Sequence, residues 1–321
     1  MTRFLALFAL SALLWPLAPE AQDSRETAFD LTRLDPSTRS AALAGAVGAL
    51  PAEDPAALYA NPALLAPEME RQLSLGFLNH LADVSAGFAT YARSVPGVGR
   101  VALGVRHLSY GDFERADGPQ EASADAFGAS ETALTAGYAY DANSRVRLGA
   151  AAHALFERVD DAESSALAAD LGVTYAVPSQ LLTLSASVHG IGVVTSSLGA
   201  DEARLPLDVR VGVAKRLRYL PLTLSVSGHE LQSFENEGGG AVDEALRHVA
   251  AAGELQLGRA LALRAGYHPG RAEGLRTGRR VDLAGLNLGF GIRTRRVTVD
   301  YARIGWGEFA GLHQFGVRVG L

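Results

Sequence analysis

The residues of this chain that could carry out chemistry are its histidines and carboxylates, because the sequence contains no cysteine. The stretch HELQSFE, which starts at His229, begins like the helical zinc motif in which two histidines on one helix face bind the metal. The second histidine of that motif is missing, and the stretch lies in or beside a predicted strand instead of on a helix. It therefore does not predict a zinc site.

The histidines are spread over different predicted strands. Histidines that are hydrogen-bonded to neighbouring side chains therefore explain them better than a shared metal site. They are His107, His153, His189, His229, His248 and His268. A carboxylate cluster at a strand end and in the following loop could bind Ca²⁺ weakly, but a solvated loop explains it better. It consists of Glu157, Asp160, Asp161 and Glu163. Because GxSxG, Walker A and Rossmann motifs are also missing, we predict no catalytic residue, no cofactor and no metal.

Composition and charge narrow the class of protein further. The 321 residues include 29 Lys and Arg against 35 Asp and Glu, so the formal net charge is −6. A strongly basic face that would bind nucleic acid is therefore not expected. The absence of cysteine excludes a disulfide framework, a thiolate metal site and a lipid-anchored N-terminal cysteine.

Residues 1–21 have the organisation of a secretory signal peptide. Arg3 supplies the positive charge, FLALFALSALLWPLA forms the apolar core, and small residues follow at Ala18 and Ala21. A proline stands at the third position before either cleavage site, which is unusual. An uncleaved anchor helix is the alternative, but about 15 apolar residues fall short of the roughly 20 that span a bilayer. Because no later run of about 18 apolar residues occurs, a helical membrane protein is excluded.

Apolar and polar residues alternate with a period of two from Gln72 to the last residue, which predicts strands. In RVALGVRHL, for example, Val101, Leu103 and Val105 share one face. About fourteen such runs occur, and most are close to the length of a tilted membrane strand. They span residues 72–80, 84–93, 100–110, 130–140, 145–157, 166–177, 180–190, 207–217, 221–232, 246–257, 260–268, 282–293, 296–304 and 312–321.

The predicted connections alternate between short and long. Links after even-numbered strands are short, whereas most links after odd-numbered strands are long, except at the first hairpin near Leu81. The long links are residues 111–129, 160–165, 191–206, 233–245, 269–281 and 305–311. Short turns on one side and long loops on the other are typical of an outer-membrane barrel, and an even strand number places both termini in the periplasm.

The polar face of the predicted strands carries charges that a soluble core would bury only at a cost. They are Arg106, Arg147, Asp170, Arg210, Arg264, Asp300 and Arg318. In a barrel these charges face the lumen and the apolar face meets lipid. We therefore predict an all-β fold over residues 72–321, a 14-stranded antiparallel outer-membrane β-barrel. A soluble exported β-protein is the weaker alternative, because such a protein has no reason to sort its loops by length.

Residues 22–71, before the first strand, can plug this barrel. A barrel of about fourteen strands is wider than its own wall side chains can fill. The stretch STRSAALAGAVGAL can pack closely, Pro55 and Pro62 fix turns, and Asn61 can hydrogen-bond the broken backbone. With Asp54 at the start of this turn region, these residues predict a short N-terminal hatch, and a periplasmic N-terminal arm is the alternative.

The stretch STRSAALAGAVGALPAEDPAALYANPALLAPEMERQLSLGF resembles the N-terminus of the PorV/PorQ family of type IX secretion system outer-membrane proteins, itself related to FadL-type fatty-acid transporters. The PorQ branch is the closest likeness. It continues through ADVSAGFATYAR, LPLDVRVGVAKRL, LSVSGHELQSF and LGFGIRTRRVTVDYAR, and so covers nearly the whole mature chain. The motif Asn61-Pro62-Ala63 is weak because FadL transporters share it, whereas the order of the segments is more specific.

The resemblance implies a FadL-like barrel in the outer membrane of a Bacteroidota-type bacterium, reached with a Sec signal peptide. It also implies a non-enzymatic part in exporting or surface-anchoring cargo proteins. The implied partners are a surface-exposed PorZ-like protein and other type IX components. Partner contacts are expected in two outer loops that need not match the family, at Asp112, Phe113, Arg115, Phe234, Glu235, Asn236 and Glu237.

A FadL-type channel for hydrophobic small molecules is the competing function, and a hatch fits both. The sequence favours the secretion role, because the chain is short for such a transporter and its lumenal positions are charged and small. A fatty acid requires a continuous apolar path. Outer-membrane lipid is an expected contact in either case, and nucleic acid in neither.

Overall fold

The structure contains the fourteen strands that the alternating pattern predicts. It is a computed structural model, and it describes residues 28–80, 83–116, 122–198, 204–233, 245–275, 284–305 and 311–321. The strands are β1 (Gln72–Asn79), β2 (Ser85–Val95), β3 (Gly99–Ala116), β4 (Ala122–Asp141), β5 (Val146–Val159), β6 (Ala162–Val177), β7 (Leu182–Ser196), β8 (Asp208–Arg216), β9 (Leu222–Gly228), β10 (Val249–Leu257), β11 (Leu261–Tyr267), β12 (Leu286–Arg293), β13 (Val297–Gly305) and β14 (Gly311–Gly320).

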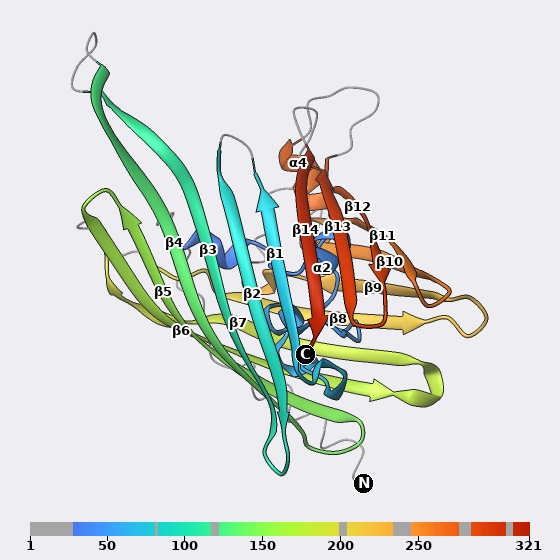
Figure 1. The fold of residues 1–321 in the computed structure, drawn as a ribbon. Helices are drawn as coiled ribbons and strands as arrows, with labels where there is room; N and C mark the ends of the chain where they lie inside the picture. The colour runs from blue at the N-terminus through green and yellow to red at the C-terminus, as the bar shows by residue number, and fades with distance from the viewer. Residues whose placement is uncertain are drawn as a thin grey trace.

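The strands close into a single antiparallel barrel in which each strand pairs with its neighbours in sequence. The first and last strands close the wall, aligning Gln72 with Gly320 and Asn79 with His313. The predicted 14-stranded antiparallel barrel is therefore confirmed. Because β1 begins where β14 ends, both ends of the wall lie on one side (Figure 1). We call this side, where even-numbered strands turn into odd-numbered ones, the short-turn end, and the opposite side the long-loop end.

The hairpin of β3 and β4 is longer than predicted. Pairing continues to Ala116 and Ala122, with a register shift between Ser109 and Asp112. Figure 1 shows this ribbon projecting beyond the neighbouring strands. The prediction of a loop over residues 111–129 is therefore wrong for most of that range. The polar and small residues there still alternate with apolar ones, and strand pairing satisfies their backbone where a loop would leave it to water.

A stacked pair of rings helps to hold this ribbon together. Phe113 in β3 lies opposite Phe127 in β4, and their ring centroids are 5.4 Å apart. The predicted long loop of residues 160–165 is also wrong, because β5 and β6 keep pairing up to Val159 and Ala162. The carboxylates of that stretch consequently lie at a tight turn and not in a flexible loop.

In the described part of the chain, several connections contain short helical elements that the alternating pattern does not predict. Among them are η5 (Pro178–Gln180), η6 (Leu231–Ser233) and α4 (Pro269–Leu275). The ninth strand ends at Gly228, so His229 lies beside it and not within it. In the described part of the chain, no helix is long and apolar enough to cross a bilayer.

The two faces of the wall differ as the sequence predicts. Large apolar side chains are exposed on the outer face, among them Leu75, Leu103, Leu134, Leu148, Leu167, Val193, Val213, Val226, Phe290 and Phe315. The inner face buries polar and charged side chains, among them Arg106, Asp170, Arg264, Asp300 and Arg318. An apolar belt outside and a polar interior are the arrangement of a membrane barrel, the reverse of a soluble protein.

Residues 28–71, which we call the hatch segment, lie inside the barrel (Figure 1). They form η1 (Asp30–Arg33), α2 (Thr38–Ala42), η2 (Pro55–Tyr59), η3 (Pro62–Leu64) and η4 (Pro67–Met69). The α2 helix contacts β11 to β14, η2 contacts β1 to β3, and η3 contacts β4 to β6. The segment therefore touches most of the wall from within.

Candidate functional site

Polar side chains cap the short helices of the hatch segment. Asp54 caps η2 and Asn61 caps η3, each accepting a hydrogen bond from the N–H two residues later, at 3.0 and 2.9 Å. A proline follows each cap, where its fixed φ suits the first helical position and its missing N–H is not needed. Ser37 Oγ donates to Asp54 Oδ2 at 2.6 Å, which joins the α2 and η2 regions. The four predicted hatch residues are thus turn-forming residues inside the lumen.

Asn61 also connects the hatch segment to the wall. Its side chain is fully buried, and its amide nitrogen lies 3.4 Å from the carbonyl oxygens of Gly48 and Val173 and 3.5 Å from that of Ala186. Val173 belongs to β6 and Ala186 to β7. One asparagine therefore caps η3 and bridges to two strands.

Glycines line the wall where the hatch segment approaches most closely. A Cβ at Gly172 would lie closer than 3.0 Å to the side chain of Asn61. A Cβ at Gly149 would meet the backbone of η3 at Ala63, and one at Gly266 would meet the backbone of Leu43, again closer than 3.0 Å. Glycine alone leaves room for this contact. A Cβ at any of four further glycines would also lie closer than 3.0 Å to an atom of the hatch segment. They are Gly104, Gly137, Gly289 and Gly316.

A buried chain of ion pairs fastens α2 to the strands on one side of the barrel. Arg39 donates two hydrogen bonds to Glu254, both at 2.8 Å, in the bidentate geometry of strong guanidinium–carboxylate pairs. Glu254 also accepts from Arg264 at 2.8 Å, and Arg264 donates to Asp300 at 2.6 Å. Asp300 accepts from Arg318 at 3.2 Å. The hatch contributes one member of this network and β10, β11, β13 and β14 the others.

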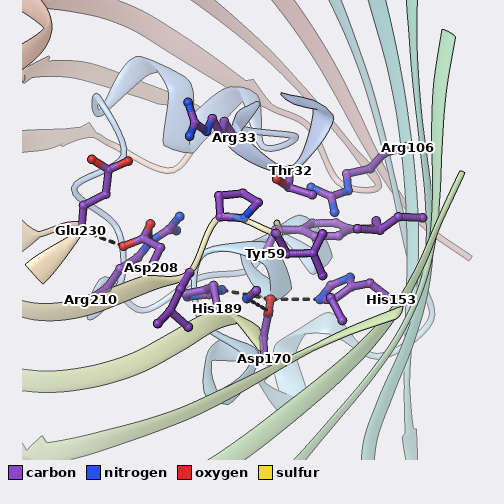
Figure 2. A pocket seen from close by; sticks show the side chains of 16 residues that line it. Thr32, Arg33, Tyr59, Arg106, His153, Asp170, His189, Asp208, Arg210 and Glu230 are labelled. Atoms are coloured by element: carbon purple, nitrogen blue, oxygen red, sulfur yellow. Dashed lines mark hydrogen bonds and ion pairs between the residues drawn. The ribbon is translucent and has the colours of Figure 1, made fainter. Parts of the chain in front are cut away.

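On the other side of the lumen, two histidines converge on one carboxylate (Figure 2). Asp170 Oδ2 lies 2.9 Å from His153 Nε2 and 2.9 Å from His189 Nδ1. The remaining ring nitrogens lie 2.9 Å from Thr135 Oγ1 and Ser187 Oγ, respectively. If each histidine is neutral and donates to Asp170, then each hydroxyl can donate to the free ring nitrogen. These lumenal histidines are therefore fully hydrogen-bonded.

A small cavity of about 70 Å³ opens beside these histidines. Figure 2 shows Tyr59 of the hatch segment and Arg106 of β3 on one side of it and Asp208 and Arg210 on the other. The guanidinium carbon of Arg106 lies 4.4 Å from the centre of the Tyr59 ring, a cation–π contact. The described lining combines these polar and charged side chains with apolar ones such as Leu155 and Leu205. This arrangement can fix the hatch in place.

The start of the hatch segment is held at a second carboxylate. Leu31 N donates to Glu131 Oε2 at 2.8 Å, and Tyr110 donates to the same carboxylate. Arg106 Nη1 donates to the carbonyl oxygen of Leu31 at 3.4 Å. Nearer to α2, Ser40 Oγ donates to Asp35, and burial raises the pKa of Asp35 to about 6. Neutralisation of Asp35 therefore falls within a mildly acidic range.

The other residues that the sequence singled out are not part of this lumenal site. Asp112 and Phe113 lie in β3 on the projecting ribbon and not in a loop, which corrects the prediction, and Arg115 lies in the same strand. Phe234, Glu235, Asn236 and Glu237 fall outside the described residues. His229 and His268 come together at the long-loop end with ring centroids 5.9 Å apart. Sequence reasoning missed Arg39, Tyr59 and Glu254. The alternation of inward positions could have suggested only Glu254, because Arg39 and Tyr59 lie in the hatch segment and not in a strand.

Comparison with known proteins identifies the fold. No protein-family model matches the chain, and no curated protein sequence matches it either. The crystal structure of the Pseudomonas putida toluene transporter TodX is similar, with a TM-score of 0.57, 14% identity, and coverage of 92% of this chain and 98% of that one. A Pseudomonas aeruginosa FadL homologue has a TM-score of 0.52 at 14% identity, covering 88% of this chain and 98% of that one.

These similarities, together with the wall and the filled lumen, define a class of protein. The chain is a 14-stranded β-barrel with the fold of FadL-type outer-membrane proteins. At this level of identity the likeness concerns the fold alone. The similar structures are those of transporters and not of enzymes.

Proposed function

We propose that this protein is an outer-membrane channel of the FadL type, closed by its hatch segment, that passes small hydrophobic molecules. The observation that carries the proposal is the hatch segment seated against glycines inside a closed 14-stranded wall. Capping residues, close packing and ion pairs build this plug from one continuous piece of chain. A plug of this kind can move without disturbing the ladder of strands, because it adds no strand to it.

The long-loop half of the interior offers an apolar place for such a molecule. Side chains from η1 with its N-cap and from seven strands form a buried apolar cluster there, composed of Phe29, Leu31, Leu78, Ala86, Phe88, Leu108, Ala133, Leu155, Ala166 and Leu312. The residues from η1 are the first of the described hatch segment. A small apolar molecule that replaced Phe29 and Leu31 would meet the same surroundings. The likeness to a toluene transporter supports a passenger of this chemistry.

A role in type IX secretion is the second candidate. The described lumen around Asp170 carries charged side chains, and the cavity there, of about 70 Å³, is small for a hydrophobic ligand. This observation favours a permanently plugged barrel that anchors a surface partner such as a PorZ-like protein. The projecting β3–β4 ribbon, with Asp112 and Phe113 exposed, would be a contact surface for that partner. The N-terminal resemblance to the PorV/PorQ family supports the same reading.

Both functions place the protein in the outer membrane. We infer that a Sec signal peptide is removed, that the short-turn end faces the periplasm, and that the source is a Bacteroidota-type bacterium if the secretion role holds. Extraction of the mature protein with outer membranes, with gel mobility that changes on heating, would support this location. Recovery in the soluble fraction would contradict it.

Uptake and partner capture separate the two candidates. Whole cells that carry the protein in their outer membrane should accumulate labelled toluene faster than cells with an empty vector. Purification from detergent-solubilised native outer membranes, followed by mass spectrometry, should recover no type IX component if the channel function is right. Uptake equal to that of the vector, together with recovery of a surface secretion protein, would favour the second candidate.

A further inference from the structure

A larger cavity lies at the short-turn end, beneath the hatch segment, and has a volume of about 780 Å³. It is lined by the end of β8, the turn between β10 and β11, the end of β12, and inward residues of β14. Its size is within the range of small-molecule sites. It lies on the other side of the hatch from the apolar cluster, and neither candidate function accounts for it.

Arginines dominate the described lining of this cavity. They are Arg39, Arg216, Arg259, Arg264, Arg293 and Arg318. The carboxylates of the lining are Glu53 and Glu254. Such an excess of guanidinium groups around one concave surface produces a positive potential, which the low-dielectric walls concentrate.

The carboxylates of the lining already form ion pairs with arginines of the lining. Glu53 pairs with Arg293, and Glu254 pairs with Arg39 and Arg264. Two further carboxylates lie behind the lining: Asp300 pairs with Arg264 and Arg318, and Asp54 acts on Arg39. Among the described residues, Arg216 and Arg259 have no ion pair. The two positive charges that remain therefore belong to these two arginines.

The strand register shows that Arg216 faces the cavity. Arg216 lies opposite Thr223, Thr223 opposite Glu254, and Glu254 opposite Arg264. Residues directly opposite each other in a sheet point to the same face. Because Glu254 and Arg264 form the buried ion pairs of the lumen, the whole row points inward. Arg259 reaches the same cavity from the turn between β10 and β11.

We propose that this cavity is a binding site for a small organic anion that carries at least two carboxylate or phosphate groups. A guanidinium fork binds either group through two parallel hydrogen bonds. A ligand with one anionic group would leave either Arg216 or Arg259 unpaired, whereas a ligand with two can neutralise both. Binding here requires no passage through the hatch, so the proposal goes beyond the channel function and is independent of it.

Titration calorimetry on the purified full-length mature chain in an uncharged detergent tests this site. Citrate and pyrophosphate are the probes, and acetate at matched ionic strength is the monoanionic reference. We expect citrate or pyrophosphate to bind saturably and at least about tenfold more tightly than acetate, since each additional charged hydrogen-bonded pair contributes on the order of 1.4 kcal/mol or more. The stronger of the two probes identifies the anionic group as carboxylate or phosphate.

The double variant Arg216→Gln/Arg259→Gln should weaken binding by about tenfold or more. Its control is Arg93→Gln/Arg145→Gln, which removes two exposed arginines at the same end but outside the cavity. The control should bind as the parent does, and heat-dependent gel mobility should show that both variants are folded. Equal loss in the two variants would assign the effect to diffuse charge and overturn the proposal, as would the absence of saturable binding of either probe.

Discussion

The side-chain oxygen of Asn61 lies where a Cβ on residue 172 would have to be. The hatch segment can therefore pack this closely against β6 only because residue 172 has no Cβ. Gly172→Ala should lower the free energy of unfolding by roughly 1–3 kcal/mol, the usual effect of overpacking a tight contact. Thermal unfolding followed by gel mobility measures this change.

Gly87→Ala is the matched control for that substitution, because no atom lies within 4 Å of a Cβ added in β2 at this position. The double variant Gly172→Ala/Asn61→Ala should recover part of the loss, because it removes the colliding side chain. Strictly additive losses in the double variant would contradict the steric explanation.

The carboxylate of Glu254 should contribute more to the stability of the protein than the guanidinium of Arg39. Glu254 accepts from both Arg39 and Arg264, so Glu254→Gln leaves two buried guanidinium groups short of a partner. We expect Glu254→Gln to destabilise the protein by about 3–5 kcal/mol. Arg39→Met leaves Glu254 still bound to Arg264, and should cost about 1–3 kcal/mol. Denaturant unfolding compares the two, and an equal or reversed order would argue against the shared-acceptor arrangement.

Asp35 should make the seating of the hatch segment depend on pH. Burial raises its pKa from 3.8 to about 6, so the folded state holds the proton more tightly than the unfolded state. The stabilisation is fully present below pH 3.8 and is lost as pH rises through about 6. Hydrogen bonds from Ser37 and Ser40 and the charges of Arg210 and Arg271 act in the opposite direction.

Asp35→Asn removes this titration. The melting temperature of the variant, relative to the parent, should rise between pH 4 and about pH 6 and stay level above it, as the parent loses the contribution. Glu68→Gln removes one exposed carboxylate of the same segment and is the control for charge alone. Parallel curves for parent and Asp35→Asn would show that Asp35 does not govern the dependence.

Removal of the hatch segment should open the barrel. Deletion of residues 41–66 takes away the end of α2 and all of η2 and η3 while leaving every strand intact. Single-channel conductance in planar bilayers should rise above that of the intact protein, because the wall of about fourteen strands encloses more space than its own side chains fill. Low conductance in both proteins would mean that other residues close the lumen.

The alternation of residues determined the wall of this protein. A period of two assigns each residue to one face, so the count of strands and the apolar outer belt followed from sequence, as did the inward direction of Arg106, Asp170 and Arg264. Strand ends were less determined. The pattern predicts a loop where Phe113 and Phe127 form part of the ribbon, because small and polar residues are compatible with a turn as well as with a strand.

The tertiary structure decided which inward residues meet. His153, Asp170 and His189 lie on three neighbouring strands, and their convergence depends on the pairing register. Arg39 reaches Glu254 across 215 residues of sequence, and Asn61 of the hatch segment packs directly on Gly172 of the wall. The local sequence encodes neither of these contacts, because both form only when the barrel closes around the hatch segment. Sequence therefore fixed the faces of the strands, and closure of the sheet selected the partners on the inner face.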